Sequence, residues 1–153
     1  MAETDEKYMK MALQEAQQAA REGEIPVGAV VVCKGRVIGR GHNMTEALTD
    51  VTAHAEMLAL TAACNTIGGK YLPDCTIYVT VEPCTMCAGA LGWAQIGRIV
   101  YGARDEKKGW FTTACGQHAT GNGVIHPKTE ITEGVLEEEC KQLMVDFFKK
   151  IRR

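Results

Sequence analysis

Two short segments constrain the fold of this chain more than any other feature: His54-Ala55-Glu56 and Pro83-Cys84-Thr85-Met86-Cys87. Each segment follows a strand-like stretch and a loop, at the point where a helical pattern begins. Helix starts that follow strands in this way can meet at one end of a sheet. We therefore expect a fold that brings these chemically reactive side chains together.

Apolar periodicity divides the chain into alternating helix-like and strand-like segments. The Gly-rich stretch 104–127 fits neither pattern. Strands that alternate with helices predict an α/β fold, with a central sheet covered by helices. The predicted helices span residues 5–21, 53–65, 83–95 and 136–151, and the predicted strands span residues 27–33, 36–41, 76–81, 98–103 and 129–132.

Single residues refine these predictions at the ends and interiors of the elements. Thr4 is expected to cap the first helix, because its hydroxyl can accept a hydrogen bond from a free backbone N–H. Pro83 is expected to be the first residue of the third helix, where a missing N–H costs nothing. Gly39 and Gly41 count against the second strand, because glycine weakens a strand interior.

The composition bounds the class of protein. A chain of 153 residues that is 46% hydrophobic, with a formal net charge of −2, is expected to form a single domain over residues 1–153. No apolar run is long enough to span a membrane, and the acidic N-terminal segment does not resemble a signal peptide. Seven cysteines without an export signal favour a cytoplasmic protein whose cysteines bind metal or act in catalysis.

Zinc accounts for the polar residues of the two short segments. Cys84 and Cys87 lie three positions apart, so one helical turn can present both sulfurs to one ion. His54 supplies a nitrogen, and three protein ligands leave a fourth tetrahedral position to water, which is typical of catalytic zinc. Glu56 lies off the helical face of His54, so it is free to carry protons as a general base and acid. The order H-x-E and then P-C-x-x-C is typical of zinc-dependent base deaminases.

The other cysteines are given simpler interpretations. Cys33, Cys64 and Cys140 lie on apolar faces and are expected to pack as small hydrophobic side chains. Cys75 has no assignment. A second metal site is a weaker alternative, and its candidates are Cys115, His118 and His126.

Further motifs extend over nearly the whole chain. With the zinc motif, they resemble the cytidine deaminase superfamily. The segment 102–105 with Lys107 and Gly109, the segment 131–135, and the basic ending after Phe147-Phe148 are similar to the bacterial tRNA-specific adenosine deaminases within it. The motifs that carry the superfamily resemblance are Ile25-Pro26-Val27-Gly28-Ala29, Gly41-His42-Asn43, Thr52-Ala53-His54-Ala55-Glu56, Tyr78-Val79-Thr80-Val81-Glu82-Pro83-Cys84, Met86-Cys87-Ala88-Gly89-Ala90 and Ile96-Gly97-Arg98.

The resemblance implies a three-layer α/β/α fold around a five-stranded mixed sheet, and a homodimer. It implies that the substrate is the anticodon loop of a tRNA, in which the wobble adenosine becomes inosine. His54, Cys84 and Cys87 match the zinc ligands and Glu56 matches the proton shuttle. Asn43 matches a substrate contact, which suits an amide that can donate and accept hydrogen bonds. The alternative for Asn43 is a loop residue that bonds its own turn.

The sequence leaves two alternatives to tRNA deamination open. Trp93-Ala94 resembles guanine deaminases, which share the zinc site, so a free base such as guanine is a second candidate substrate. The simpler interpretation of Trp93 is packing in the core. A non-enzymatic RNA-binding module shaped by zinc is the third hypothesis. RNA contact is expected from a basic C-terminal end, formed by Lys149, Lys150, Arg152 and Arg153.

Overall fold

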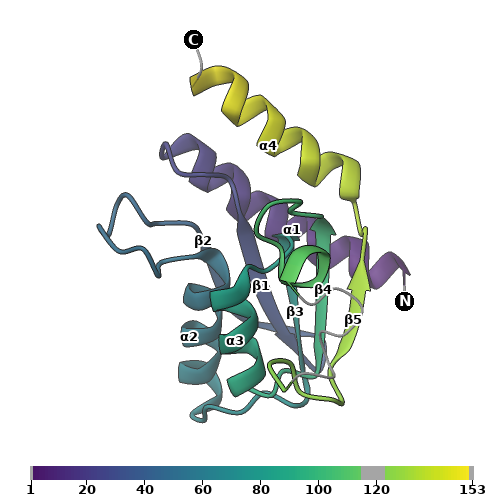
Figure 1. Ribbon diagram of the computed structural model, residues 1–153. Coiled ribbons are helices and arrows are strands. Elements are labelled where there is room, and N and C mark those ends of the chain that lie inside the picture. Colours follow the sequence, from purple (N-terminus) through teal and green to yellow (C-terminus); the bar gives the residue numbers. More distant parts are fainter. Residues whose placement is uncertain (1, 115–122, 152–153) are drawn as a thin grey trace.

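A five-stranded mixed sheet forms the centre of the computed structural model, which describes residues 2–114 and 123–151 (Figure 1). The strand order is β2-β1-β3-β4-β5. β1 pairs antiparallel with both β2 and β3, whereas β3, β4 and β5 are mutually parallel neighbours. The strands are β1 (Gly28–Cys33), β2 (Arg36–His42), β3 (Cys75–Val81), β4 (Arg98–Ala103) and β5 (Glu130–Glu133).

The helices and strands confirm the predicted order of elements. The α-helices are α1 (Ala2–Arg21), α2 (Ala55–Ile67), α3 (Thr85–Trp93) and α4 (Glu137–Ile151). Two predictions about helix starts are wrong. Thr4 does not cap α1, because the helix already begins at Ala2. Pro83 does not open α3, because Cys84 is the N-cap and the helix begins at Thr85. Among the residues described, no helix is both long and apolar enough to cross a bilayer.

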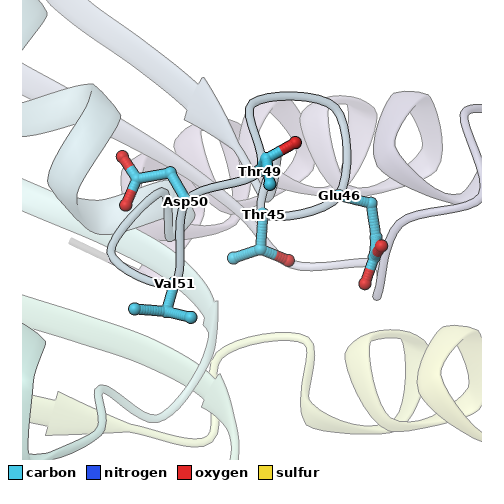
Figure 2. Close-up of a pocket in the computed structure, with 5 residues that line it drawn as sticks. All are labelled: Thr45, Glu46, Thr49, Asp50 and Val51. Carbon is cyan, nitrogen blue, oxygen red and sulfur yellow. The ribbon is translucent and has the colours of Figure 1, made fainter.

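The connection between β2 and α2 folds back on itself and forms a shallow pocket that is open to solvent (Figure 2). Thr45, Glu46, Thr49, Asp50 and Val51 line this pocket, and none of the predicted metal ligands does. Glu24, which is buried, holds the loop in place: its carboxylate accepts hydrogen bonds from the N–H of Glu46 at 3.0 Å and of Ala47 at 2.7 Å. The pocket is therefore a feature of the loop and lies apart from the metal-ligating residues.

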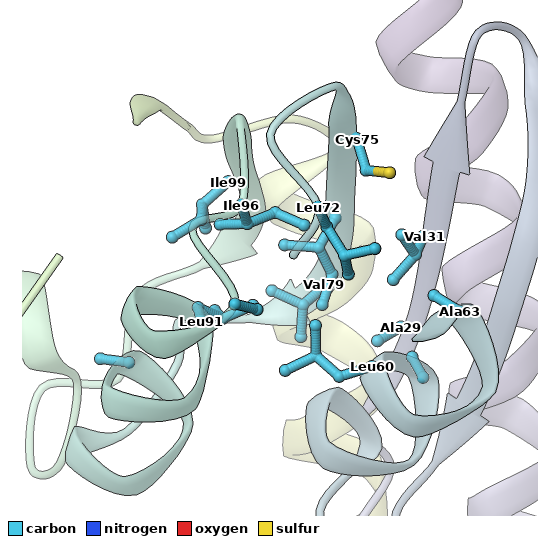
Figure 3. Close-up of a cluster of buried hydrophobic side chains, with 14 of the residues drawn as sticks. Ala29, Val31, Leu60, Ala63, Leu72, Cys75, Val79, Leu91, Ile96 and Ile99 are labelled. Carbon is cyan, nitrogen blue, oxygen red and sulfur yellow. The ribbon is translucent and has the colours of Figure 1, made fainter. Parts of the chain in front are cut away.

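Two apolar clusters, one on each face of the sheet, produce the three predicted layers. α2 and α3 cover the first face, where Leu60 and Leu91 meet strand residues such as Val79 (Figure 3). α1 and α4 cover the other face, where Met9 and Cys140 belong to one cluster with alternate residues of the same strands. Side chains alternate between the faces of a strand, so both faces of the central strands are buried.

The cysteines that were expected to pack do so. Cys140 is buried, and Cys33 and Cys64 are partly buried against the cluster under α2. Cys75, which had no assignment, is buried in that same cluster. Cys115 and His118 lie outside the described residues, so the alternative second metal site stays untested. The packing interpretation of Trp93 is wrong, because 84% of that residue is exposed.

Gly39 and Gly41 strengthen the packing of β2 instead of interrupting the strand. A Cβ atom at Gly39 would overlap the carbonyl oxygen of Ala59, and one at Gly41 would lie 2.5 Å from the carbonyl oxygen of Ala55. The two glycines therefore let the backbone of α2 lie directly on β2. Glycine weakens a strand through its backbone entropy, but at these two positions the close approach of a helix requires it.

Asp5 ties α1 to the sheet through a buried ion pair. Arg98 donates to both of its carboxylate oxygens at 2.8 Å, and the hydroxyl of Tyr78 donates to Oδ1 at 2.9 Å. Arg98 also donates to Thr132 Oγ1 at 2.9 Å, which extends the network to β5. The hydrogen bonds from Arg98 have the largest effect on the pKa of Asp5 and hold it below its ordinary value of 3.8. Burial has the opposite but smaller effect on this pKa.

Replacement of Gly39 by alanine is expected to lower the free energy of unfolding by about 2 kcal/mol, because the new methyl group forces α2 away from β2. Gly69→Ala is the matched control, since the nearest atom to its Cβ would be 3.8 Å away. The control is expected to stay within about 0.5 kcal/mol of the wild type in urea unfolding. Equal stabilities for the two variants would contradict the close approach.

Asp5→Asn is expected to lower the free energy of unfolding by about 2 kcal/mol at pH 7, because Arg98 loses its charged partner. The folded-state pKa of Asp5 lies below 3.8, so its contribution is present above that pH and is lost as the pH falls through the folded-state value. Urea unfolding at pH 7 and near pH 3 measures this change. A difference between variant and wild type that does not shrink in acid would contradict the assignment.

Candidate active site

The direction of the strands places both short segments at one edge of the sheet. β2 and β3 are each antiparallel to β1, so they run the same way and their carboxyl ends share an edge. His54 is the N-cap of α2, which follows β2, and Cys84 is the N-cap of α3, which follows β3. Neither side chain makes a capping hydrogen bond to its own helix. The expectation that the two helix starts meet is therefore confirmed.

His54, Cys84 and Cys87 have the spacing of a tetrahedral metal site. The Nδ1 atom of His54 lies 3.7 Å from the sulfur of Cys84 and 3.6 Å from that of Cys87. All three ligand atoms lie within 4.8 Å of one another. Zinc bonds of about 2.0–2.1 Å to nitrogen and about 2.3 Å to sulfur, at tetrahedral angles, separate such atoms by about 3.6 Å. The three side chains therefore fit one zinc ion without rearrangement.

The charges of the three ligands also fit a cation. The pKa of the Cys84 thiol falls to about 3, because the Cys87 thiol and then the His54 imidazole donate hydrogen bonds to its thiolate. The pKa of Cys87 rises, since its thiol donates to that thiolate and is buried. The hydrogen bond to the Cys84 thiolate likewise raises the pKa of His54. A divalent cation between the sulfurs removes the penalty for ionising the second thiol.

Glu56 lies in the first turn of α2, two residues beyond His54, and only 4% of it is exposed. Burial is the main cause that raises the pKa of its carboxyl group to about 7. A group with that pKa can both take and release a proton near neutral pH. The proton-shuttle role of Glu56 stays a prediction, and its position beside the metal ligands suits that role.

Asn43 lies at the start of the loop that follows β2, and 7% of it is exposed. Its Oδ1 atom accepts a hydrogen bond from the N–H of Thr45 at 3.1 Å, and its Nδ2 atom donates to the carbonyl oxygen of Ile25 at 3.2 Å. These are the bonds of the alternative interpretation, in which the amide serves its own turn. The amide keeps a second hydrogen and a second lone pair, so contact with a substrate stays a prediction.

The basic C-terminal end is only partly described. Lys149 and Lys150 are exposed in the last turn of α4, whereas Arg152 and Arg153 lie outside the described residues. The charges of the two lysines favour the negative end of the helix dipole, so their presence is explained without RNA. Their contact with RNA stays a prediction.

Glu82 is a buried group to which the sequence analysis gave no role. It lies directly before Pro83 at the end of β3, and 3% of it is exposed. Its carboxylate accepts hydrogen bonds from residues of the loop after β4. An acidic residue that ends an apolar strand and precedes a metal-ligating turn is the signal that could have identified it.

Known proteins share this site and fold. A family model of the cytidine and deoxycytidylate deaminase zinc-binding region matches residues 2–103. The tRNA-specific adenosine deaminase of Bacillus subtilis (strain 168) is 42% identical over 97% of this chain and 91% of its own length. A solved structure from a study of A-to-I editing by tRNA:A34 deaminases at the wobble position of transfer RNA is 41% identical, with a TM-score of 0.83, and the match covers 90% of this chain and 98% of that chain.

A guanine deaminase from Bacillus subtilis is also similar, but over less of its length. Its structure is 40% identical, with a TM-score of 0.62, and the match covers 65% of this chain and 64% of that chain. The family model and the geometry of the three ligands confirm zinc as the cofactor. The extent of the first relative's match, over nearly the full length of both chains, then decides the branch. The chain belongs to the family of tRNA-specific adenosine deaminases, within the zinc-dependent deaminases.

Proposed function

We propose that this protein converts adenosine to inosine at the wobble position of a tRNA anticodon. The observation that carries the proposal is one buried carboxylate, Glu56, beside a zinc site of one imidazole and two thiolates. The near-complete match to a tRNA-specific adenosine deaminase supports the choice of substrate. An anticodon loop is already single-stranded, so moving its adenine into a site costs less than opening a duplex.

His54, Cys84 and Cys87 hold the metal in this proposal. Zinc supplies a water whose pKa is lowered to about 7, which makes it a nucleophile at neutral pH. The Glu56 carboxylate takes a proton from the attacking water as it adds to C6 of adenine. Glu56 delivers this proton to the ring nitrogen, then takes the proton of the hydroxyl now on C6 and passes it to the leaving amino group, so the C–N bond breaks, ammonia departs and inosine remains. One group can do both tasks because its pKa lies near 7.

Asn43 is proposed as a substrate contact at the edge of the site. Its side chain is held from two directions, by Thr45 and Ile25, so its remaining donor and acceptor have fixed directions. A fixed amide loses little conformational freedom when it binds a base or a ribose. Its hydrogen bonds to the turn therefore favour substrate binding and do not compete with it.

The protein is further proposed to act as a single domain over residues 1–153, as a homodimer, in the cytoplasm. Large apolar side chains on the surface support an interaction with another chain: Trp93 and Val51 are each 84% exposed. Tryptophan is enriched in protein interfaces, so the exposed indole of Trp93 supports this proposal. The family resemblance supports a second copy of this chain as the partner.

Guanine is the second candidate substrate. The guanine deaminase from Bacillus subtilis is as similar in identity as the tRNA enzyme, but the match covers a smaller share of both chains. Ammonia release from an anticodon stem-loop with a wobble adenosine, compared with release from guanine, separates the two. We expect turnover of the stem-loop, and activity on guanine alone would overturn the proposal.

Glu56→Gln is expected to reduce turnover of the stem-loop by at least about a hundredfold while zinc is retained, because an amide cannot carry the proton. Inosine formation and zinc content are measured on the same sample. Glu138→Gln is the matched control, since Glu138 also lies in the first turn of a helix but is exposed on α4. Full inosine formation by Glu56→Gln would contradict the proton-shuttle role, whereas a zinc-loaded wild type that binds the stem-loop and forms no inosine would favour the non-enzymatic RNA-binding module.

Removal of the basic C-terminal charges is expected to weaken stem-loop binding and its salt dependence. Each phosphate contact that is lost should lower the slope of log affinity against log salt by about 0.7. An unchanged affinity and slope would remove this role and leave only the helix-dipole explanation. The variant replaces Lys149, Lys150, Arg152 and Arg153 with alanine, and the control replaces exposed Lys7, Lys10, Arg21 and Arg36.

A further inference from the structure

Glu82 carries a buried carboxylate that the proposed mechanism does not use. It accepts a hydrogen bond at Oε1 from the N–H of Asp105 at 3.0 Å and at Oε2 from the N–H of Thr112 at 2.7 Å. The hydroxyl of Thr112 donates to Oε1 as well. A buried carboxylate is stable only when donors surround it, and here every donor comes from the loop after β4. The loop and the carboxylate therefore hold each other in place.

The loop 104–112, whose last residues begin the short π-helix η1 (Trp110–Ala114), is shaped around this carboxylate. A Cβ atom at Gly109 would lie 2.5 Å from each carboxylate oxygen of Glu82, so only glycine leaves room for the charge. The same loop is attached to the metal-ligating turn: Gly109 forms a β-bridge with Cys84, and the N–H of Trp110 donates to the carbonyl oxygen of Pro83 at 2.9 Å. The loop therefore lies directly against the turn that carries Cys84.

The loop presents two positive charges beside the metal ligands. Lys107 and Lys108 are exposed, and their backbone N–H groups donate to Oδ1 of Asp105 at 3.1 and 3.0 Å, which fixes the turn that carries them. Lys108 lies directly before Gly109, whose backbone pairs with that of the ligand Cys84, so the turn that carries the lysines adjoins the metal-ligating turn. Exposed lysines of this kind can bind the phosphates of an RNA through their charge.

We propose that Glu82 is a positioning residue for RNA: its carboxylate holds the loop 104–112 so that Lys107 and Lys108 contact phosphates beside the metal site. This inference rests on the proposed function. Glu82 acts on substrate binding through the loop, and the metal keeps its three ligands without it. The role differs from that of Glu56, which moves protons.

Glu82→Gln tests the role with little change in side-chain volume. The amide group turns one acceptor into a donor that faces the loop N–H groups, so the loop loses its anchor. We expect the KM for the wobble-adenosine stem-loop to rise at least about tenfold, with zinc content unchanged and kcat within about threefold. The slope of log KM against log salt should fall by up to about 1.4, because contacts with two phosphates are lost.

Asp5→Asn is the control for a general loss of stability. Asp5 is also a buried carboxylate, but it lies on the opposite face of the sheet, so its loss should leave KM and the salt slope unchanged. Gly109→Ala is the second variant, because its methyl group displaces the loop while Glu82 stays intact, and it decides the test if Glu82→Gln does not fold. The double variant should show less than the product of the two single effects.

The outcomes separate this inference from the proposed function. A wild type that acts on guanine and not on the stem-loop overturns both. A wild type that acts on the stem-loop, with Glu82→Gln and Gly109→Ala unchanged in KM and salt slope, overturns the role of Glu82 alone. Loss of zinc from Glu82→Gln in proportion to activity would also overturn it, since the effect would then lie in the metal site.

Discussion

The site depends on the placement of two sulfurs and one imidazole nitrogen close enough together to bind one cation. His54 and Cys84 are helix N-caps at one edge of the sheet, and Cys87 lies one turn further along α3. Nδ1 of His54 lies 3.6–3.7 Å from both sulfurs, which matches the edge of a zinc tetrahedron. β1 lies between β2 and β3 and is antiparallel to both, and this arrangement brings the two helix starts to the same edge.

Buried carboxylates hold the loops on either side of this site. Glu24 accepts hydrogen bonds from the loop after β2, and Glu82 accepts them from the loop after β4. A loop without regular structure must satisfy its backbone N–H groups, and a buried carboxylate can satisfy several of them at once. On the other face of the sheet, Asp5 joins α1 to the strands through the side chains of Arg98 and Tyr78. The chain therefore uses buried charge to fix its loops and its first helix, while proton transfer is proposed for Glu56.

The order of helices and strands and the three metal ligands could be predicted from the sequence. Apolar periodicity located the helices and strands, and the spacing of His54, Cys84 and Cys87 predicted the ligands that the structure brings together. Contacts between distant segments were not predictable. Gly39 counted against a strand that in fact lies under α2, and Trp93 was expected in the core but is exposed. The partners of Glu82 lie more than twenty residues away in the sequence, so periodicity could not reveal them.

X-ray absorption at the zinc edge of the purified protein measures directly whether His54, Cys84 and Cys87 are the protein ligands of the zinc. With seven cysteines in the chain, the number of sulfur ligands distinguishes this site from other arrangements. We expect two sulfurs at about 2.3 Å and one imidazole nitrogen at about 2.0 Å from the protein. Three or four sulfur ligands would indicate a closed structural site and would contradict a catalytic zinc held by His54, Cys84 and Cys87. The absence of zinc from the purified protein would contradict it as well.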